Sequence, residues 1–245
     1  MKLSVIIPAY NEAANLKSGV LDQVDSYLKE QDYSYEVVIV DDGSTDNSVE
    51  LIKEQISNKK GFRLVENAHG GKAITTMTGL LAGKGEVVLF TDLDQSTPLD
   101  QVEQFFPKFD EGFDVVIGSR EGRKGAPLVR KLSAWGFSLL RTVILGLPFK
   151  DTQCGFKAFT DQAAQEIFGP LLVEWQRQKA KKAAVNAGWD VELLFIAKKK
   201  GLKIAEVPVE WHYVGTERVQ LIGDAVEAVK DMLKVRVNNL RGVYN

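Results

Sequence analysis

The stretch EVVLFTDLD, residues 86–94, decides the fold class because it joins a short apolar run to two acidic residues. An apolar run of this length predicts a β-strand that is buried on both faces, as the strands of parallel sheets are. Asp92 and Asp94, one residue apart just after this strand, can approach one hard cation that a diphosphate also binds. The tripeptide alone would also fit a turn, but its place after a buried strand favours a metal site.

Similar apolar runs lie on both sides of this stretch, and helical patterns separate them. We expect further strands over residues 3–8, 36–40, 62–65 and 114–118. We expect helices over residues 12–29 and 73–82, and another that Thr45 or Asp46 caps and that ends at Ile56. Strands separated by helices predict an α/β fold with a mostly parallel central sheet and helices on both faces.

The second half of the chain is less regular. It predicts helices over residues 128–147 and 191–200, a loop over 151–156, a strand over 203–209 and an amphipathic helix over 219–240. The apolar faces near Leu139 and Val229 could support a homodimer or a membrane contact. Because we find neither an internal repeat nor a low-complexity linker, we predict one domain, residues 1–245, with halves 1–120 and 121–245.

The composition predicts a soluble globular protein, with 44% apolar and 26% charged residues and a formal net charge of −2. This balance argues against a nucleic-acid-binding protein, which normally carries a basic face. With one cysteine, Cys154, and two histidines, the chain offers mainly oxygen ligands for a metal, which favours Mg²⁺ or Mn²⁺. The amino terminus lacks the pattern of a secretory signal, so we expect a cytoplasmic location.

Two stretches could touch a membrane surface. Residues 132–149 are apolar but are interrupted by an arginine, two glycines and a proline, so they do not predict a clean membrane-spanning helix. Residues 171–188 predict a basic helix with Leu171, Leu172 and Trp175 at one end. Such a helix could lie on anionic lipid, or it could be an ordinary surface helix. A peripheral position on the inner face of the membrane is therefore part of the expectation.

Polar motifs follow several of the predicted strands, at the edge where α/β sheets bind their ligands. Asp41 and Asp42 could accept hydrogen bonds from a ribose or a nucleobase, although the same run also suits a helix cap. The run Gly70-Gly71-Lys72 could present amides and an ammonium to phosphate, but the chain has neither a P-loop pattern nor a GxGxxG after the first strand. Arg120 and Arg130 suit anion binding.

Other polar and aromatic residues leave two interpretations open. Asp190 and Glu192 could steer a sugar hydroxyl or act as a base, and they equally suit the first turn of a helix. His69 and His212 could be ligands or could have ordinary polar partners. Trp175, Trp189 and Trp211 could stack on a sugar or pack against apolar neighbours.

The chain resembles the family-2 glycosyltransferases with the GT-A fold, a three-layer α/β sandwich, in a series of motifs between residues 3 and 211. These motifs, in the order of the family, are SVIIPAYNE, VVIVDDGSTD, GGKA, FTDLDQSTP, VIGSR, DTQCGFKAF, WDVELLFIA and EVPVEW. Within that family the chain is most similar to the dolichyl-phosphate glucosyltransferase and dolichyl-phosphate mannose synthase group. The segment DTQCGFK favours the glucosyltransferase branch.

The resemblance implies a role for each motif. Residues 1–120 would form a nucleotide-sugar-binding half and residues 121–245 an acceptor-binding half. The donor side would include Pro8, Tyr10, Glu12, Asp42 and Lys72. Asp41 joins this set because it is one of the two aspartates at the end of its predicted strand. Asp92 and Asp94 would bind the cation, and Arg120 and Arg130 would meet phosphate. The loop from Asp151 to Lys157, which contains Gln153, would line the acceptor side.

The implied reaction is the inverting, metal-dependent transfer of a hexose from a nucleotide sugar, with UDP-glucose expected before GDP-mannose, to a polyprenyl or dolichyl phosphate. A lipid phosphate is already an anion at neutral pH, so it needs no general base. A glycan hydroxyl, the alternative acceptor, requires a base, which Asp151, Asp190 or Glu192 would supply. A sugar nucleotidyltransferase and a non-catalytic nucleotide-sugar binding module are the remaining alternatives.

Overall fold

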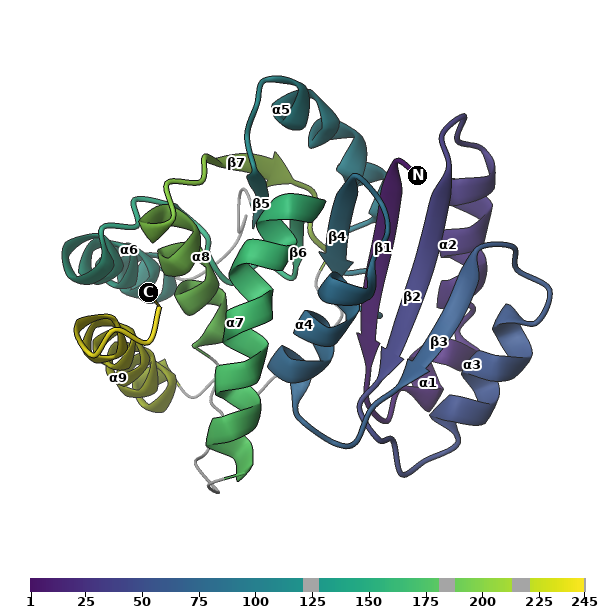
Figure 1. The fold of residues 1–245 in the computed structure, drawn as a ribbon, viewed down its shortest axis with the longest axis horizontal. Helices are drawn as coiled ribbons and strands as arrows, with labels where there is room; N and C mark the ends of the chain where they lie inside the picture. The colour runs from purple at the N-terminus through teal and green to yellow at the C-terminus, as the bar shows by residue number, and fades with distance from the viewer. Residues whose placement is uncertain (121–127, 181–187, 213–220, 245) are drawn as a thin grey trace.

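The computed structural model describes residues 1–120, 128–180, 188–212 and 221–244, with only the backbone course described for 128–135, 137, 178–180 and 221–228. Figure 1 shows a central sheet with helices around it. The strands are β1 (Leu3–Ala9), β2 (Tyr35–Asp41), β3 (Phe62–Glu66), β4 (Val87–Thr91), β5 (Val115–Arg120), β6 (Phe156–Thr160) and β7 (Ile204–Val209).

The seven strands form one sheet in the order β3-β2-β1-β4-β6-β5-β7. All neighbouring strands are parallel except β6, which runs antiparallel to β4 and β5. The predicted strands are confirmed to within two residues at each end, whereas β6 was not predicted. It was missed because the buried Lys157 interrupts its short apolar run, and because most of it lies beyond the loop expected over residues 151–156.

The helices are α1 (Ala13–Lys17), α2 (Val20–Lys29), α3 (Ser48–Ile56), α4 (Lys72–Ala82), α5 (Phe106–Asp110), α6 (Leu128–Leu145), α7 (Asp161–Ala180), α8 (Trp189–Lys199) and α9 (Leu221–Leu240), with a 3-10 helix η1 (Leu99–Gln104). The single helix predicted over residues 12–29 is wrong, because Gly19 adopts a left-handed conformation with φ of 83° and separates α1 from α2. The third helix begins at Ser48 rather than after Thr45 or Asp46.

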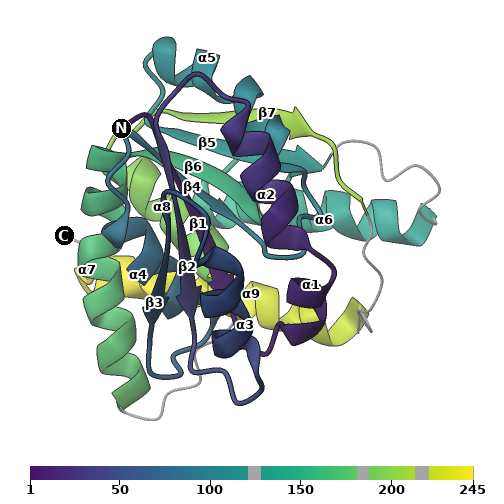
Figure 2. The same cartoon turned by 90° about the vertical axis from the view of Figure 1, so that its right-hand side faces the viewer.

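Apolar side chains alternate between the two faces of the sheet, and helices cover both faces (Figure 2). Val5 and Ile7 of β1 pack in the cluster that includes residues of α1, α2 and η1. Ile6, between them, packs in the cluster that includes residues of α4, α7, α8 and α9. This alternation builds three layers, and it confirms the predicted α/β sandwich.

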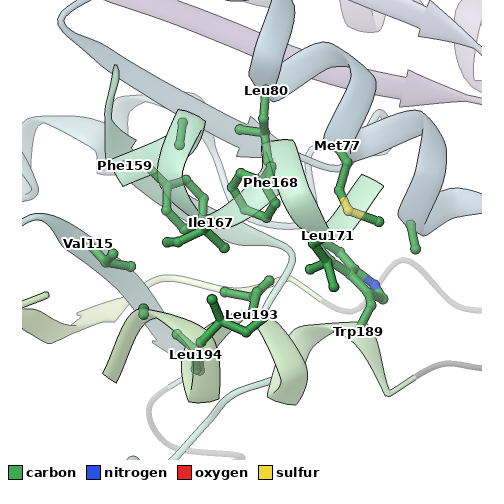
Figure 3. Close-up of a cluster of buried hydrophobic side chains, with 14 of the residues drawn as sticks. Met77, Leu80, Val115, Phe159, Ile167, Phe168, Leu171, Trp189, Leu193 and Leu194 are labelled. Atoms are coloured by element: carbon green, nitrogen blue, oxygen red, sulfur yellow. The ribbon is translucent and has the colours of Figure 1, made fainter. Parts of the chain in front are cut away.

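The helix α7 packs one face against the core and leaves the other exposed, with Val173 66% exposed, so its described part agrees with the ordinary surface helix that was one expectation for residues 171–188. Its residue Leu171 packs beside Phe168 and close to Leu193 of α8 (Figure 3). Leu171 and Trp175 are 3% and 5% exposed, so they are not available to a lipid surface. Residues 181–187 of that stretch lie outside the described part of the chain. None of the helices in the described part is long and apolar enough to cross a membrane.

Candidate active site

The carboxyl ends of β1, β2 and β4 meet at one edge of the sheet and surround a pocket of about 370 Å³. Parallel strands place their carboxyl ends, and the loops that follow them, on the same edge. The lining of this edge pocket comprises Pro8, Ala9, Tyr10, Glu12, Asn15, Asp42, His69, Gly71, Lys72, Thr75, Asp92, Leu93 and Asp94. The structure therefore brings Asp42 and residues 92–94, from two of the predicted strand-end motifs, together with residues 8–12, which the resemblance assigned to the donor side, whereas Arg120 of the third motif does not line this pocket.

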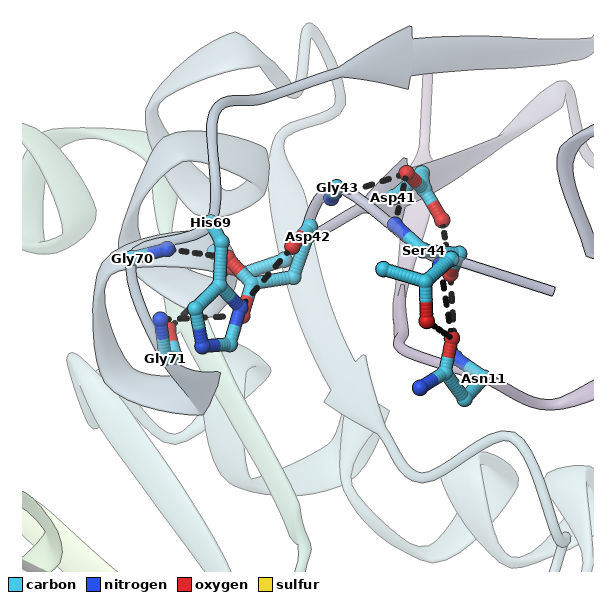
Figure 4. Close-up of polar contacts among 10 residues, drawn as sticks. Asn11, Asp41, Asp42, Gly43, Ser44, His69, Gly70 and Gly71 are labelled. Carbon is cyan, nitrogen blue, oxygen red and sulfur yellow. Dashed lines mark hydrogen bonds and ion pairs between the residues drawn. The ribbon is translucent and has the colours of Figure 1, made fainter.

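Asp42 orders the glycine-rich loop before α4 (Figure 4). Its carboxylate accepts hydrogen bonds from the amides of Gly70 at 2.6 Å and Gly71 at 2.9 Å. The Nδ1 atom of His69 lies 3.0 Å from the same carboxylate, and the His69 ring stacks on Tyr10 with ring centroids 4.6 Å apart. A buried carboxylate thus holds the loop that begins α4, while Tyr10 and His69 present an aromatic wall to the edge pocket.

Asp41 has a different setting from its neighbour Asp42. Its carboxylate accepts hydrogen bonds from the amides of Gly43 and Ser44, both at 2.9 Å, and from the Ser44 hydroxyl. The side chain is buried and does not line the edge pocket. The geometry therefore gives Asp41 the role of stabilising the turn after β2, whereas Asp42 faces the pocket.

Asn11 is a residue of this region that the sequence analysis missed. Its φ of 55° lies in the left-handed region, which asparagine tolerates better than most residues. Its side-chain oxygen accepts a hydrogen bond from the amide of Thr45 at 2.8 Å, and its own amide donates to the Ser44 hydroxyl at 2.9 Å. Asn11 therefore joins the loop after β1 to the loop after β2 (Figure 4).

Asp92 and Asp94 lie on opposite sides of Leu93 directly after β4, and both line the edge pocket. The ammonium of Lys72 lies 2.6 Å from Asp92 Oδ1, and Asp94 Oδ1 accepts a hydrogen bond from the amide of Ser96 at 2.9 Å. Gly155 closes over Asp92 from the loop before β6, since a Cβ atom at Gly155 would lie 2.0 Å from Asp92 Oδ2. The absence of a side chain at Gly155 makes room for this carboxylate.

The residues present fit a hard cation. Both carboxylates offer oxygen ligands, and the Lys72 ammonium on Asp92 shows that a positive charge is favoured at this position. Within the described residues, no group of three or more histidine, cysteine or acidic side chains is placed to hold a metal ion. Two carboxylates and substrate phosphates are a common ligand set for Mg²⁺ in phosphate-binding sites.

Arg120, at the end of β5, forms a two-point ion pair with Asp151. Arg120 Nε lies 2.5 Å from Asp151 Oδ2, and Arg120 Nη2 lies 2.9 Å from Oδ1. Burial opposes the ionisation of Asp151, but the hydrogen bonds from Arg120 outweigh it and lower its pKa below the usual range. Glu206 accepts the amides of Lys150 and Asp151 and so holds this loop against β7. Asp151 is therefore ionised and paired with Arg120, and its lowered pKa makes it a weak base.

A second ion pair joins Lys157 of β6 to Asp190 at the start of α8. Lys157 is fully buried, and its Nζ atom lies 2.6 Å from Asp190 Oδ1 and donates to the carbonyl of Cys154. Burial raises the pKa of Asp190, while Lys157 opposes this rise. Since its ammonium is enclosed by protein groups, Lys157 acts on Asp190 rather than facing an acceptor directly.

Several other predicted residues are placed away from the edge pocket. Glu192 is buried and accepts hydrogen bonds from Trp175 Nε1 at 2.8 Å and from the Tyr244 hydroxyl, so its role is structural. Gln153 is exposed, and its amide donates to Asp151 Oδ1 at 3.1 Å. The side chain of Arg130 lies outside the described residues, although its backbone belongs to α6.

Of the remaining ambiguous residues, Trp189 is buried and packs edge-on against Phe90. Trp211 is 37% exposed and lies beside the guanidinium of Arg120, whose Cζ atom is 5.7 Å from the ring centroid. His212 is exposed, and its amide donates to the Ser96 carbonyl at 2.8 Å, next to Asp94. Among the tryptophans whose side chains the structure describes, Trp211 is therefore the one close to Arg120, a predicted anion-binding residue.

Comparison with known proteins identifies the family of this chain. The model of "Glycosyl transferase family 2" matches residues 4–168. The chain belongs to this family. Relatives that carry the name dolichyl-phosphate beta-glucosyltransferase match almost the whole chain. The Dictyostelium discoideum protein is 32% identical over 99% of this chain and 76% of its own length. The Saccharomyces cerevisiae protein is 33% identical over 99% and 76%. The Homo sapiens protein is 30% identical over 99% and 77%.

Solved structures confirm the fold of this glycosyltransferase. Glucosyl-3-phosphoglycerate synthase from Mycobacterium tuberculosis, in complex with UDP, matches with a TM-score of 0.65 and 21% identity, over 96% of this chain and 79% of that chain. Mannosyl-3-phosphoglycerate synthase from Rubrobacter xylanophilus matches with a TM-score of 0.62 and 15% identity, over 99% and 74%. The predicted GT-A fold and the predicted enzyme class, a glycosyltransferase, are both confirmed.

Proposed function

We propose that this glycosyltransferase transfers glucose from UDP-glucose to dolichyl phosphate or another polyprenyl phosphate, with inversion at the anomeric carbon. The observation that carries the proposal is the match to dolichyl-phosphate beta-glucosyltransferases at 30–33% identity over 99% of the chain. The edge pocket supports it independently, because it combines an aromatic wall, the carboxylate pair Asp92 and Asp94 and the Lys72 ammonium, as a nucleoside diphosphate requires.

On the donor side, the Tyr10–His69 stack would receive the nucleobase, and Pro8, Glu12 and Asp42 would border the ribose. Asp42 also holds the amides of Gly70 and Gly71, so the loop that leads to Lys72 is ordered before the donor binds. A preordered loop lowers the entropic cost of binding. Asp41 supports this arrangement indirectly through the turn after β2.

Asp92 and Asp94 would hold a divalent cation, Mg²⁺ or Mn²⁺, together with the donor diphosphate. Mycobacterial glucosyl-3-phosphoglycerate synthase, which has the same fold, was crystallised with Mn²⁺ and UDP. Such a cation stabilises the negative charge that grows on a departing diphosphate. Lys72 contacts Asp92 and would be close enough to contribute its own positive charge on the same side.

Arg120, which contacts both Asp151 and Trp211, would serve the acceptor side. An acceptor phosphate is mostly a dianion at neutral pH because its second pKa is about 6, so it can attack without a general base. Arg120 would offset the repulsion between this dianion and the donor diphosphate. Asp151, with a lowered pKa, is well suited to orienting Arg120 and poorly suited to accepting a proton.

The alternative acceptor is a glycan hydroxyl, which does require a base. Asp190 is then the better candidate, because its pKa is raised and that of Asp151 is lowered. Asp190→Asn should therefore leave transfer to a lipid phosphate within a few-fold of wild type but reduce transfer to a hydroxyl by about 10²-fold or more. Asp151→Asn should weaken both reactions through the loss of the Arg120 geometry, so it is the matched comparison.

We propose that the two halves of the chain bind different substrates. Residues 1–120 would bind the nucleotide sugar, and residues 121–245 would bind the acceptor within the same catalytic domain. The strand β6 of the second half lies between β4 and β5 of the first half, so one sheet supports both sides of the site. A lipid-linked acceptor would require the enzyme to work at a membrane surface, and we propose the cytoplasmic face.

The test is a donor screen with purified protein, Mg²⁺ or Mn²⁺ and a short-chain polyprenyl phosphate. UDP-glucose and GDP-mannose are compared, and both the released nucleoside diphosphate and the glycolipid are measured. We expect UDP and glucosyl lipid in equal amounts from UDP-glucose, with loss of both in Asp94→Asn. GDP-mannose as the better donor would overturn the proposed donor. Transfer to a sugar but not to the lipid phosphate would overturn the proposed acceptor.

A further inference from the structure

We propose that the outer face of α6 and α9 binds the surface of a membrane that contains anionic phospholipid. This inference rests on the proposed lipid-phosphate acceptor, and it adds the part of the protein that meets the lipid. The face is defined by six exposed apolar side chains: Leu139, Leu140 and Val143 of α6, and Leu233, Val237 and Leu240 of α9. We call it the α6–α9 face.

The six side chains form two stripes at helical spacing on two neighbouring helices. Leu233, Val237 and Leu240 are separated by four and three residues, which places them on one side of α9. The helices α6 and α9 pack against each other, and Figure 1 shows them at the end of the molecule away from β3. Val143 is 74% exposed and Leu240 is 83% exposed, so the stripes leave large apolar side chains in water. Such a patch marks an interaction surface.

Positive charge accompanies this apolar surface. A cavity of about 390 Å³ lies where α6, α8 and α9 meet, and Val143 of the α6–α9 face forms part of its wall. Lys198, Lys199 and Arg236 also line it, and no acidic side chain does so among the described residues. Apolar side chains next to a group of cations match the interface of an anionic bilayer, where acyl chains lie beneath negatively charged head groups.

The charges favour lipid over a second copy of the chain as the occupant. A symmetric dimer through this face would bring the same patch of each copy together, and thus lysine and arginine close to lysine and arginine. Placing like charges across an interface costs free energy, whereas each cation near an anionic membrane strengthens binding. The chain order also suits a lipid acceptor, because α6 follows β5, which ends at Arg120 of the acceptor side.

Flotation with vesicles tests the proposal. Wild-type protein is mixed with vesicles of phosphatidylcholine alone or of phosphatidylcholine with phosphatidylglycerol, and the bound fraction is measured at low and high salt. We expect binding to the anionic vesicles and weaker binding at high salt, because salt screens surface charge. Val143→Asp should reduce the partition coefficient about tenfold or more. Arg236→Gln should reduce it about fivefold on anionic vesicles and leave the neutral ones unchanged.

The chain offers a matched control for the apolar substitution. Val173 of α7 is 66% exposed, and α8 separates α7 from the α6–α9 face (Figure 1). Val173→Asp introduces the same charge at a similarly exposed valine and should leave vesicle binding unchanged. Equal losses in Val143→Asp and Val173→Asp would overturn the assignment of the surface, as would a wild type that ignores anionic vesicles. A wild-type dimer that Val143→Asp converts to monomer, without vesicle binding, would assign the face to a second copy instead.

The enzymatic readout keeps this proposal separate from the proposed function. Val143→Asp should transfer glucose to a short-chain acceptor in solution at the wild-type rate, and lose activity only toward a long-chain acceptor in vesicles. If wild type fails with the short-chain acceptor, the proposed function is overturned while the vesicle binding still stands on its own measurement. If Val143→Asp loses activity equally with both acceptors, the face serves catalysis or folding and the membrane proposal is overturned.

Discussion

The two edges of the sheet differ in how they satisfy their charges, although β1, β2 and β4 contribute to both. At the amino ends, Glu36 accepts hydrogen bonds from the Ser4 hydroxyl and the Lys84 amide, each at 2.7 Å, and from Arg63 Nε at 3.0 Å. Ser4 in turn accepts the amide of Gly85 at 2.8 Å. The carboxylate is buried among protein donors, so this edge stabilises the fold.

At the carboxyl ends, the acidic groups face a pocket instead. Asp92 has the half-exposed Lys72 as its partner, and its side chain is 34% exposed. Its neighbour Asp94 receives one amide from Ser96 and lines the same pocket. These carboxylates retain oxygen atoms for a ligand, whereas Glu36 does not. The comparison shows that the charged groups at the amino edge stabilise the fold, whereas the carboxylates at the carboxyl edge remain able to bind a substrate or its cation.

The largest expected effect is that of Asp94→Asn, which tests whether a carboxylate at the carboxyl edge serves activity rather than stability. We expect kcat to fall about 10³-fold, because a ligand to the proposed cation is lost, while the free energy of unfolding changes by less than about 0.5 kcal/mol. Glucosyl transfer and urea unfolding are measured on the same preparation. Asp100→Asn in η1, at an exposed aspartate away from the pocket, is the matched control and should change neither quantity. A large loss of stability in Asp94→Asn would show that the carboxyl edge also supports the fold.

The next effect is that of Gly155→Ala, which tests how closely Asp92 is positioned. The new Cβ atom would meet Asp92 Oδ2 at 2.0 Å, so the carboxylate must move. We expect activity to fall about 10²-fold, because small displacements at a reacting centre have effects of this size. The control is Gly169→Ala in α7, where the added Cβ has nothing within 4 Å and should be neutral or stabilising. Full activity in Gly155→Ala would contradict the role assigned to Asp92.

The third effect concerns stability at the amino edge. Burial opposes the ionisation of Glu36, but hydrogen bonds from Ser4, Arg63 and Lys84 outweigh it and lower its pKa below the usual 4.5. The ionised form therefore stabilises the fold above that value, and this stabilisation is lost as the pH falls through the lower folded-state pKa. We expect Glu36→Gln to lose about 2 kcal/mol of unfolding free energy at pH 7.

The difference between Glu36→Gln and wild type should shrink as the pH falls below the usual value of 4.5, since wild type then loses its ionised carboxylate as well. Urea unfolding at a series of pH values measures this difference, and kcat of the folded variant should stay at the wild-type value. A constant difference across the acidic range would mean that shape, rather than charge, makes Glu36 important. A fall in kcat would remove the distinction between the two edges.

The sequence predicted which residues lie at the carboxyl edge of the sheet better than it predicted the contacts between those residues. The fold class followed from alternating strands and helices, and the pocket residues Asp42, Asp92 and Asp94 followed from their positions after buried strands. Contacts between distant segments carry no such periodic signal. The pairing of Lys72 with Asp92 and the room that Gly155 leaves for Asp92 depend on how three loops meet, so neither could be predicted.

Neighbouring residues with the same chemistry could also not be separated from sequence. Asp41 and Asp42 are adjacent acids, yet Asp41, which ends β2, stabilises the turn after the strand, and Asp42, just beyond the strand, holds the loop before α4 and faces the pocket. Asp190 and Glu192 both open α8, yet Asp190 pairs with Lys157 while Glu192 binds Trp175 and Tyr244. Only the surroundings of each acid decide its role. The strand β6 was missed for a related reason, since its pairing with β4 and β5 overrides a weak local pattern.

The smallest expected effect is at Asn11, which lies at the carboxyl edge but stabilises structure as Glu36 does. Replacing Asn11 removes the bond to the Thr45 amide in either variant, but only alanine resists the left-handed φ of 55°. We expect Asn11→Gly to lose about 1 kcal/mol of unfolding free energy, and Asn11→Ala to lose about 1 kcal/mol more. The KM for the donor should rise a few-fold in the same order while kcat stays constant, because the loop borders the edge pocket without contacting the reacting atoms. Equal values for both variants would show that the backbone relaxes, and that the two loops are held together by contacts other than Asn11.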